Sequence, residues 1–199
     1  TLEVELTASE RRYRLDGRQV PPRDYRGRLE VVVYSTDRLR VIHGPMRERR
    51  QYLDRQAAAL WPSYHAELRV FERLLTQRNA ALARGARDLD VWTERFVLSA
   101  VRLRRRRAEY ARQLSTELDR GFRPAGESYA VRCFEPSASD EESARQLAQE
   151  LGSLGGRERA AGRTLVGPQR DAVALLIDGE DAAHAASSGQ ARSLLLALT

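Results

Sequence analysis

Three consecutive helical patterns fill residues 46–121, and they constrain the fold more than any other feature of the chain. Apolar residues recur there at three- and four-residue steps, as they do on one face of a helix. The first pattern follows Gly44-Pro45 and reaches Trp61-Pro62, where the proline breaks or restarts a helix. The second ends near Gly85 and the third near Gly121. Helices this long in 199 residues predict a helical hairpin or arm, not a compact enzyme core.

Strand-like segments precede this arm. Residues 1–6 alternate apolar and polar side chains, and residues 12–15 run into Asp16-Gly17, a strong hairpin-turn dipeptide. Residues 29–34 are β-branched and suit a buried strand. The sequence therefore predicts a strand-rich region over residues 1–44.

The pattern returns to strands and helices after about residue 126. We expect strands at 129–134, 164–166 and 173–177, and a helix over 139–154 that Gly155-Gly156 stops. This order predicts an α/β protein in which a helical arm, residues 45–125, is inserted between a strand-rich part, 1–44, and a returning part, 126–199.

Arginine supplies every basic residue, because the sequence contains no lysine among its 34 basic residues. With 28 acidic residues the net charge is +6, which makes an acidic or nucleic-acid partner reasonable. A genome of biased base composition explains the missing lysine equally simply. A phosphate-binding loop of the G-x-x-x-x-G-K-[ST] type needs that lysine, so these residues do not contain one.

The sequence gives little support for a membrane, secreted, disulfide-bonded or metal-binding protein. No apolar run approaches the length of a membrane span, and the first residues lack a secretory signal, so we expect a cytoplasmic protein. The single Cys133 excludes an intramolecular disulfide and is interpreted as a small core residue. Because the three histidines are scattered, no metal site is expected. A strand at residue 1 and an apolar helix over 191–199 without a stop signal suggest an internal piece of a longer protein.

The stretch 186–192 carries the most chemistry. Serine is a favoured helix N-cap, and Gly189 would let a phosphate approach the free amides and positive dipole end of the following helix. A plain N-cap before a core helix explains the same residues.

Four strings together resemble the RecF family of recombinational-repair ATPases, whose head belongs to the ABC and SMC class. Residues 187–192 (SSGQAR) resemble the signature motif, and residues 164–171 (TLVGPQRD) resemble the family's T-x-x-G-P-H-R-D string. Residues 43–54 (HGPMRERRQYLD) and 75–82 (LTQRNAAL) resemble its G-x-P-x-x-R-R-x-x-L-D and L-x-Q-R-N-x-x-L stretches. The four strings occur in the family's order.

The resemblance implies an ABC/SMC-type ATPase head with an inserted arm. It implies that two heads dimerise around ATP and Mg²⁺, with the signature residues Ser187, Gly189 and Gln190 of one head on the γ-phosphate held by the other. It further implies DNA binding, recombination mediators such as RecR as partners, and help in loading the strand-exchange protein. Because the phosphate-binding loop is missing, we expect no ATP hydrolysis by these residues alone.

Two positions depart from the family pattern. Gln169 replaces the histidine of G-P-H-R-D, so that position cannot titrate near neutral pH. Ala186 replaces the leucine that usually opens the signature, which leaves a smaller apolar anchor.

Several charged groups have both a structural and a functional interpretation. Arg170 and Asp171 form either a turn ion pair or a nucleotide-proximal or interface site. Residues 77–79 (QRN) interrupt an apolar helix face and predict a hydrogen-bond network between helices, with recognition at the tip of the arm as the alternative. Near the base of the arm, three arginines are expected on exposed surface, as solvated residues or as DNA-backbone contacts: Arg47, Arg49 and Arg50.

An arginine run dominates the third helical pattern, where residues 101–123 hold eight arginines against three acidic residues. Four consecutive helical residues cannot all face one DNA backbone, so the run is either solvated or binds phosphate with part of its members. We expect Arg107 to pack its stem on the apolar face and reach water with its guanidinium. The possible DNA contacts in the run are Arg104, Arg105 and Arg106.

Two alternatives to a RecF-like ATPase remain open. The first is a helical module that binds DNA or protein without nucleotide chemistry, in which residues 187–190 are only a cap. The second is another SMC-type ATPase, although residues 46–122 leave little room for a long coiled coil.

Overall fold

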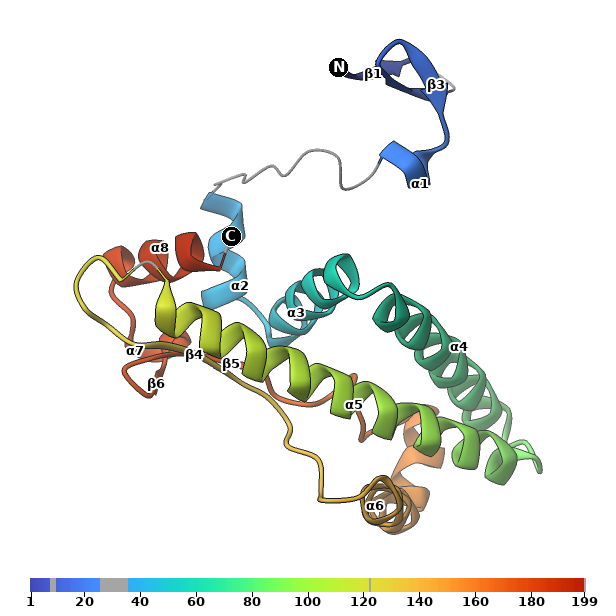
Figure 1. The fold of residues 1–199 in the computed structure, drawn as a ribbon. Helices are drawn as coiled ribbons and strands as arrows, with labels where there is room; N and C mark the ends of the chain where they lie inside the picture. The colour runs from blue at the N-terminus through green and yellow to red at the C-terminus, as the bar shows by residue number, and fades with distance from the viewer. Residues whose placement is uncertain (8–9, 26–35, 122, 199) are drawn as a thin grey trace. The chain divides into compact units, whose positions relative to one another are not determined.

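A computed structural model describes residues 1–7, 10–25, 36–121 and 123–198 of the chain (Figure 1). The chain divides into two compact units, residues 1–34 and residues 35–198. Among the described residues, no helix is both long enough and apolar enough to cross a bilayer.

The first unit is a small antiparallel sheet. Strand β1 (Leu2–Leu6) pairs with β2 (Arg11–Leu15), which pairs with β3 (Arg18–Val20), and a short helix α1 (Pro22–Tyr25) follows. Asp16 and Gly17 make the β2–β3 turn with φ of 49° and 77°, both in the left-handed region that a two-residue hairpin requires. The predicted strands and turn are confirmed.

Three helices form the arm in the second unit: α3 (Met46–Leu60), α4 (Pro62–Arg84) and α5 (Leu89–Arg120). Pro62 opens α4 at its first position, where the missing N–H costs no hydrogen bond, and Gly85 ends α4 with φ of 61°. Helices α4 and α5 run side by side as a hairpin (Figure 1). The helical arm and its breaks are therefore as the sequence predicts.

A second antiparallel sheet packs against α5. It contains β4 (Tyr129–Arg132), β5 (Ala174–Ile177) and the two-residue β6 (Glu180–Asp181), in that order. Helix α6 (Asp140–Ala161) lies between β4 and β5 in the chain and contacts α4 and α5. The chain then continues through α7 (Ala182–Ala185) and α8 (Ser188–Ala197).

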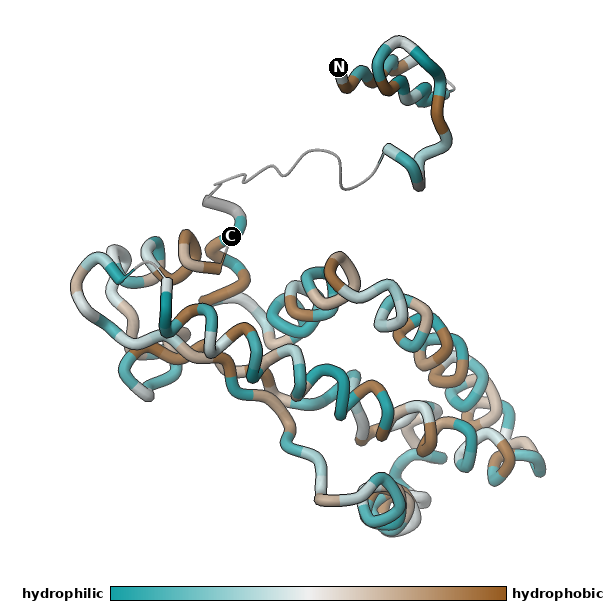
Figure 2. Tube along the Cα trace, viewed as in Figure 1, coloured by the Kyte–Doolittle hydropathy of each residue, from teal (hydrophilic) through white to brown (hydrophobic). Residues whose placement is uncertain are grey.

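The core of the second unit joins the arm to the sheet. Hydrophobic residues recur along α4 and α5 with hydrophilic residues between them (Figure 2). Phe96 and Leu103 of α5 are fully buried, as are Tyr64 of α4 and Leu194 of α8. One continuous apolar cluster therefore holds the arm helices, the sheet and α8 together.

Residues 36–43 differ from the strand-like prediction for residues 1–44. They form a 3-10 turn, η1 (Thr36–Leu39), and a short helix, α2 (Arg40–His43), in which Val41 and Ile42 are buried. A short apolar pair such as Val41-Ile42 fits a strand as well as a helical turn, because it is too short to show a period. The sequence therefore predicted strand structure where a helix forms. The strand predicted at 29–34 lies outside the described residues.

Two predictions in the returning part are wrong. Residues 164–166 are not a strand, because side chains take the backbone donors: Asn79 Oδ1 accepts from the Thr164 amide at 2.8 Å, and Glu158 Oε1 accepts from the Leu165 amide at 2.7 Å. Helix α6 does not stop at Gly155-Gly156 but continues to Ala161 and ends at Gly162, where φ is 61°. Buried Leu147, Leu151 and Glu158 pack on both sides of the glycine pair and outweigh its low helix propensity.

Cys133 follows β4 and is buried, as the sequence predicts. Burial raises the pKa of its thiol from 9.0 to about 11, so the thiolate is roughly 100-fold scarcer at a given pH than in the unfolded chain. We expect iodoacetamide at pH 8 to alkylate the native chain roughly 100-fold more slowly than the urea-unfolded chain, as followed by mass spectrometry.

Stability depends on the same thiol. The unfolded thiol loses its proton near pH 9 and the folded one near pH 11, so this group lowers the free energy of unfolding as the pH rises from 9 to 11. In the iodoacetamide experiment above, equal alkylation rates in the native and unfolded chains would contradict the burial of Cys133.

Candidate functional site

The start of α8 carries the predicted signature residues. Ser187 is the N-cap: its Oγ accepts from the Gln190 amide at 3.2 Å, and the Gln190 side chain accepts from the Ser187 amide at 2.9 Å. This reciprocal pair is a capping box. The first amides of the helix, those of Ser188 and Gly189, have no intrahelical acceptor and lie on exposed residues. The helix start therefore offers one hydroxyl and two amides to an anion.

A second candidate region is the connector loop, defined here as residues 163–173 between α6 and β5. Arm residues hold it at several points. Arg107 donates to the Pro168 carbonyl at 2.8 Å, and Arg50 donates to the Asp171 carbonyl at 2.9 Å. Gly167 packs against Phe96, where an added Cβ would lie 2.8 Å from the ring. These contacts fix the loop that contains the family-like string 164–171.

Asp171 forms a buried ion pair with Arg104 of α5. Arg104 donates from Nε at 2.8 Å and from Nη2 at 2.6 Å to the two carboxylate oxygens, which is the bidentate geometry that arginine allows. The guanidinium also lies 3.8 Å from the centre of the Phe134 ring. Arg104 is only 6% exposed, so it cannot contact a DNA backbone while this pair is formed. Arg170, next in the string, is exposed.

Arg49 is buried as well, which corrects the expectation that it lies on exposed surface. It is 4% exposed, and its guanidinium donates to Asp181 at 3.2 Å and to the Ile42 carbonyl at 2.7 Å. Its neighbours differ, because Arg47 is exposed and Arg50 is half-buried. Arg49 lies on a different side of α3 from Arg47 and Arg50, which are three positions apart and line one cleft.

Arg107 does not reach water, contrary to the prediction. It is 3% exposed, and its Nε and Nη2 each donate to an Asp54 carboxylate oxygen at 3.0 Å. The Tyr64 hydroxyl donates to the same carboxylate. Burial alone would lower the pKa of Arg107, but the Asp54 carboxylate raises it and the net direction is upward. Burial and then the Asp54 charge raise the pKa of Tyr64.

The network predicted around residues 77–79 is confirmed for Arg78 and Asn79. Arg78 is 2% exposed and donates to Glu158 at 2.6 Å, to Thr164 Oγ1 at 2.7 Å and to Thr93 Oγ1 at 3.0 Å. It thereby joins α4, α5, α6 and the connector loop. Gln77 is exposed and takes no part in these bonds.

Arg105 and Arg106 are partly exposed on α5. Arg105 pairs with Asp140 at the start of α6, and Arg106 pairs with Glu109 at 2.9 Å while its guanidinium lies 4.8 Å from the centre of the Trp61 ring. Both charges are therefore partly neutralised within the chain. The arginine run divides into buried members, Arg104 and Arg107, and paired surface members.

Most of the family-like strings meet through these bonds. In string 75–82, Arg78 donates to Thr164 and Asn79 accepts from it. In string 43–54, Asp54 accepts from Arg107, which also donates to the Pro168 carbonyl. The fourth string, at Ser187, is separate, because no hydrogen bond or ion pair joins it to the connector loop in the part of the chain described. The two candidate regions are thus a helix start and an arginine-clamped loop.

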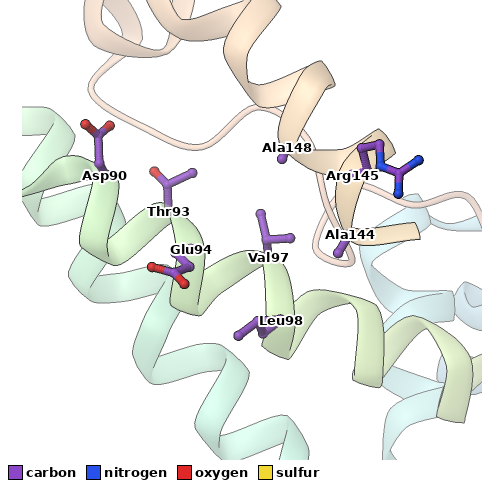
Figure 3. Close-up of a pocket in the computed structure, with 8 residues that line it drawn as sticks. All are labelled: Asp90, Thr93, Glu94, Val97, Leu98, Ala144, Arg145 and Ala148. Carbon is purple, nitrogen blue, oxygen red and sulfur yellow. The ribbon is translucent and has the colours of Figure 1, made fainter. Parts of the chain in front are cut away.

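A groove between α5 and α6 is largely apolar (Figure 3). Its volume is about 430 Å³; Val97 of α5 points toward Ala144 and Ala148 of α6, and Leu98 also lines it. Its charged residues, Asp90, Glu94 and Arg145, come from the same two helices. The groove has no arrangement of acid, base or nucleophile that would support catalysis.

Glu158 and Asp54 are the polar residues that the sequence analysis missed. Glu158 continues the 147, 151, 154 spacing of the buried face of α6, and that spacing was a signal that the helix continues past Gly155-Gly156. Asp54 lies in string 43–54, but nothing in the sequence pairs it with Arg107, which is 53 positions away.

No family model matches the chain. Curated relatives named "DNA replication and repair protein RecF" are 35% identical in Symbiobacterium thermophilum, over 86% of this chain and 49% of the relative, and 33% identical in Anaeromyxobacter sp., over 92% and 53%. A third, from Synechococcus sp., is 31% identical over 99% of this chain and 57% of its own length. The chain thus spans about half the length of these relatives.

Solved structures agree on the fold. A structure of the recombination mediator protein RecF-ATP in the RecFOR pathway superposes with a TM-score of 0.81, covering 95% of this chain and 54% of that one at 20% identity. A second, RecF-ATPrS, gives 0.82 over 99% of this chain. The predicted fold class, part of an ABC/SMC-type head with a helical arm, is confirmed. By sequence and by fold, the chain therefore matches about half of a RecF protein.

Proposed function

We propose that this chain is the arm-and-signature part of a RecF-like ATPase that acts in recombinational DNA repair. In this proposal the complete protein binds ATP with Mg²⁺ and dimerises on gapped or double-stranded DNA. It acts in the cytoplasm with mediators such as RecR to help load the strand-exchange protein. Support comes from the similarity to curated RecF proteins and from a solved structure of the same fold described as RecF-ATP.

The start of α8 is the observation that carries the nucleotide part of the proposal. A hydroxyl and two amides without intrahelical acceptors fit phosphate oxygens, and the helix dipole favours their negative charge. Ser187, Gly189 and Gln190 would contact the γ-phosphate held by a second copy. The ATP supplies the charged group that joins two heads, while this chain supplies the donors.

Replacing Ser187 by aspartate tests this role without removing the cap. Aspartate caps helices as well as serine does, so the Ser187→Asp variant keeps the helix start but repels a phosphate. In the complete protein that contains this chain, we expect ATP and Mg²⁺ to produce dimers of the wild type and monomers of this variant, as measured by light scattering. The melting temperatures of the two proteins should agree.

Ser139 provides a matched control, because it caps α6 with the same bond, from the Glu142 amide to its Oγ. The Ser139→Asp variant adds the same charge to a helix start that the proposal does not use. It should dimerise like the wild type. Wild-type-like dimerisation of Ser187→Asp would contradict the proposed nucleotide contact and favour a module without nucleotide chemistry.

A further inference from the structure

A cleft of about 450 Å³ lies between α3, α4 and the connector loop, and five arginines line it: Arg107, which is paired with Asp54, and four others. Arg47 and Arg50 come from α3, while Arg163 and Arg170 come from the connector loop. Arginines from two segments more than 100 positions apart in the sequence are thus gathered around one hollow. Such a gathering of like charges is unfavourable unless an anion neutralises it.

Among the described residues, the acidic residues of the cleft form no ion pair with these four arginines. Asp54 and Glu72 are its two acidic lining residues, and both Asp54 oxygens are bound by Arg107. Arg50 donates to the backbone carbonyl of Asp171 and not to its carboxylate, which is bound by Arg104.

The charge of the four arginines is therefore at most partly compensated. Among the described residues, none of them has a carboxylate within ion-pair distance, whereas Arg49, Arg78, Arg104 and Arg107 each have one. Burial, and next the charge of Arg107, lower the pKa of Arg50; the Asp171 and Asp54 carboxylates raise it and Arg170 lowers it, and the net direction is downward. The positive charges of Arg107 and Arg170 are therefore close enough to lower the pKa of Arg50.

The α4 side of the cleft is mainly apolar, with Glu72 as its one charged residue among those described. Leu68, Phe71 and Leu75 of α4 line it, and Asn79 and Gln169 add amide groups beside them. A phosphate among the arginines would place its attached organic group against this side. A nucleotide unit has this combination of a charged phosphate with a flat, partly apolar base and polar edges.

The loop that carries Arg170 is held before any ligand arrives. Arg107 binds the Pro168 carbonyl, Arg78 binds Thr164, and Arg104 binds Asp171, so loop residues on both sides of Arg170 are fixed. A preorganised site loses less entropy on binding than a mobile one. The buried ion pairs therefore hold the cleft open in one geometry.

We infer that this cleft binds the phosphate group of a nucleotide unit through Arg47, Arg50, Arg163 and Arg170. The unit belongs either to a DNA strand or to a free nucleotide. The DNA source rests on the proposed function, whereas the phosphate site itself does not. Arg49 and Arg104 take no part, because their guanidinium groups are buried in ion pairs.

A triple variant of the 199-residue chain tests the site: Arg47→Gln, Arg163→Gln and Arg170→Gln. These three side chains are exposed and have no carboxylate partner among the described residues, so the fold should survive their loss. Arg50 stays, because it binds the connector loop. The matched control changes three exposed arginines away from the cleft, with the same loss of charge: Arg69→Gln, Arg112→Gln and Arg157→Gln.

The probes are sodium pyrophosphate, ADP and a labelled 20-base-pair DNA duplex. We expect pyrophosphate to raise the melting temperature of the wild type and the control but not of the cleft variant. If the source is DNA, the cleft variant should bind the duplex at least about tenfold more weakly than the control, and the slope of log affinity against log salt should fall by roughly 2. If the source is a free nucleotide, ADP binding should be lost instead while duplex binding is equal in the two variants.

Two results would overturn the inference. One is equal behaviour of the cleft variant and the control toward all three probes, because net charge alone would then explain any binding. The other is a wild type that binds none of them. The proposed function fails separately, since its readout is ATP-dependent dimerisation of the complete protein, which the cleft variant does not probe.

Discussion

The Arg78→Met variant is expected to lose about 3 to 5 kcal/mol of unfolding free energy, because it leaves a buried carboxylate without its counter-ion. Glu158 is 0% exposed and pairs with Arg78 at 2.6 Å. The same substitution removes donors from Thr93 and Thr164. Domains of this size have roughly 5 to 15 kcal/mol of stability in total, so the loss should be plain in urea unfolding followed by circular dichroism.

The matched control is Arg73→Met on the same helix. Arg73 is exposed and forms no ion pair among the described residues, so this variant should change the stability by less than about 0.5 kcal/mol. The double variant Arg78→Met with Glu158→Leu should recover much of the loss, since apolar groups can replace a buried pair. If Arg78→Met and Arg73→Met were equally stable, Glu158 would have to be solvated.

Two glycine-to-alanine substitutions are expected to change stability in opposite directions. At Gly167, φ is +124°, and an added Cβ would lie 2.8 Å from the buried Phe96 ring. Backbone strain and overpacking together should cost about 2 to 5 kcal/mol in Gly167→Ala. At Gly156, inside α6, an added Cβ meets nothing within 4 Å. Gly156→Ala should therefore stabilise the chain by about 0.5 to 1 kcal/mol through helix propensity.

Urea midpoints of the two variants check this pair of predictions. The Gly156 result also tests whether α6 continues through Gly155-Gly156, because an alanine beyond a helix end would give no such gain. Destabilisation by Gly156→Ala, or a neutral Gly167→Ala, would contradict the packing described for α6 or for the connector loop.

Local signals were enough to predict the arm. Pro62 and Gly85 act within one turn of their own position, and the Asp16-Gly17 turn depends on two residues alone. The Ser187 cap is local in the same way, since its partner is Gln190. The family-like strings added the fold class, which the superposition with solved RecF structures confirms.

The partners of the buried arginines could not be predicted in this way. Arg104 and Asp171 are 67 positions apart, and Arg49 and Asp181 are 132 apart, so no local pattern links them. An arginine on an apolar helix face, such as Arg107, is also compatible with a stem that packs and a head that reaches water. The choice depends on whether a carboxylate is present in the fold, and that is a property of the tertiary structure.

The order in which a ribosome makes the chain gives the buried ion pairs a further consequence. Arg49, Arg78 and Arg104 are synthesised well before their partners Asp181, Glu158 and Asp171. Until those carboxylates emerge, closing the arm would bury three unpaired charges, which is strongly unfavourable. The arm must therefore wait, exposed and incompletely packed, for residues up to 181 to leave the ribosome, and during translation it is the part of this chain that most needs protection from aggregation.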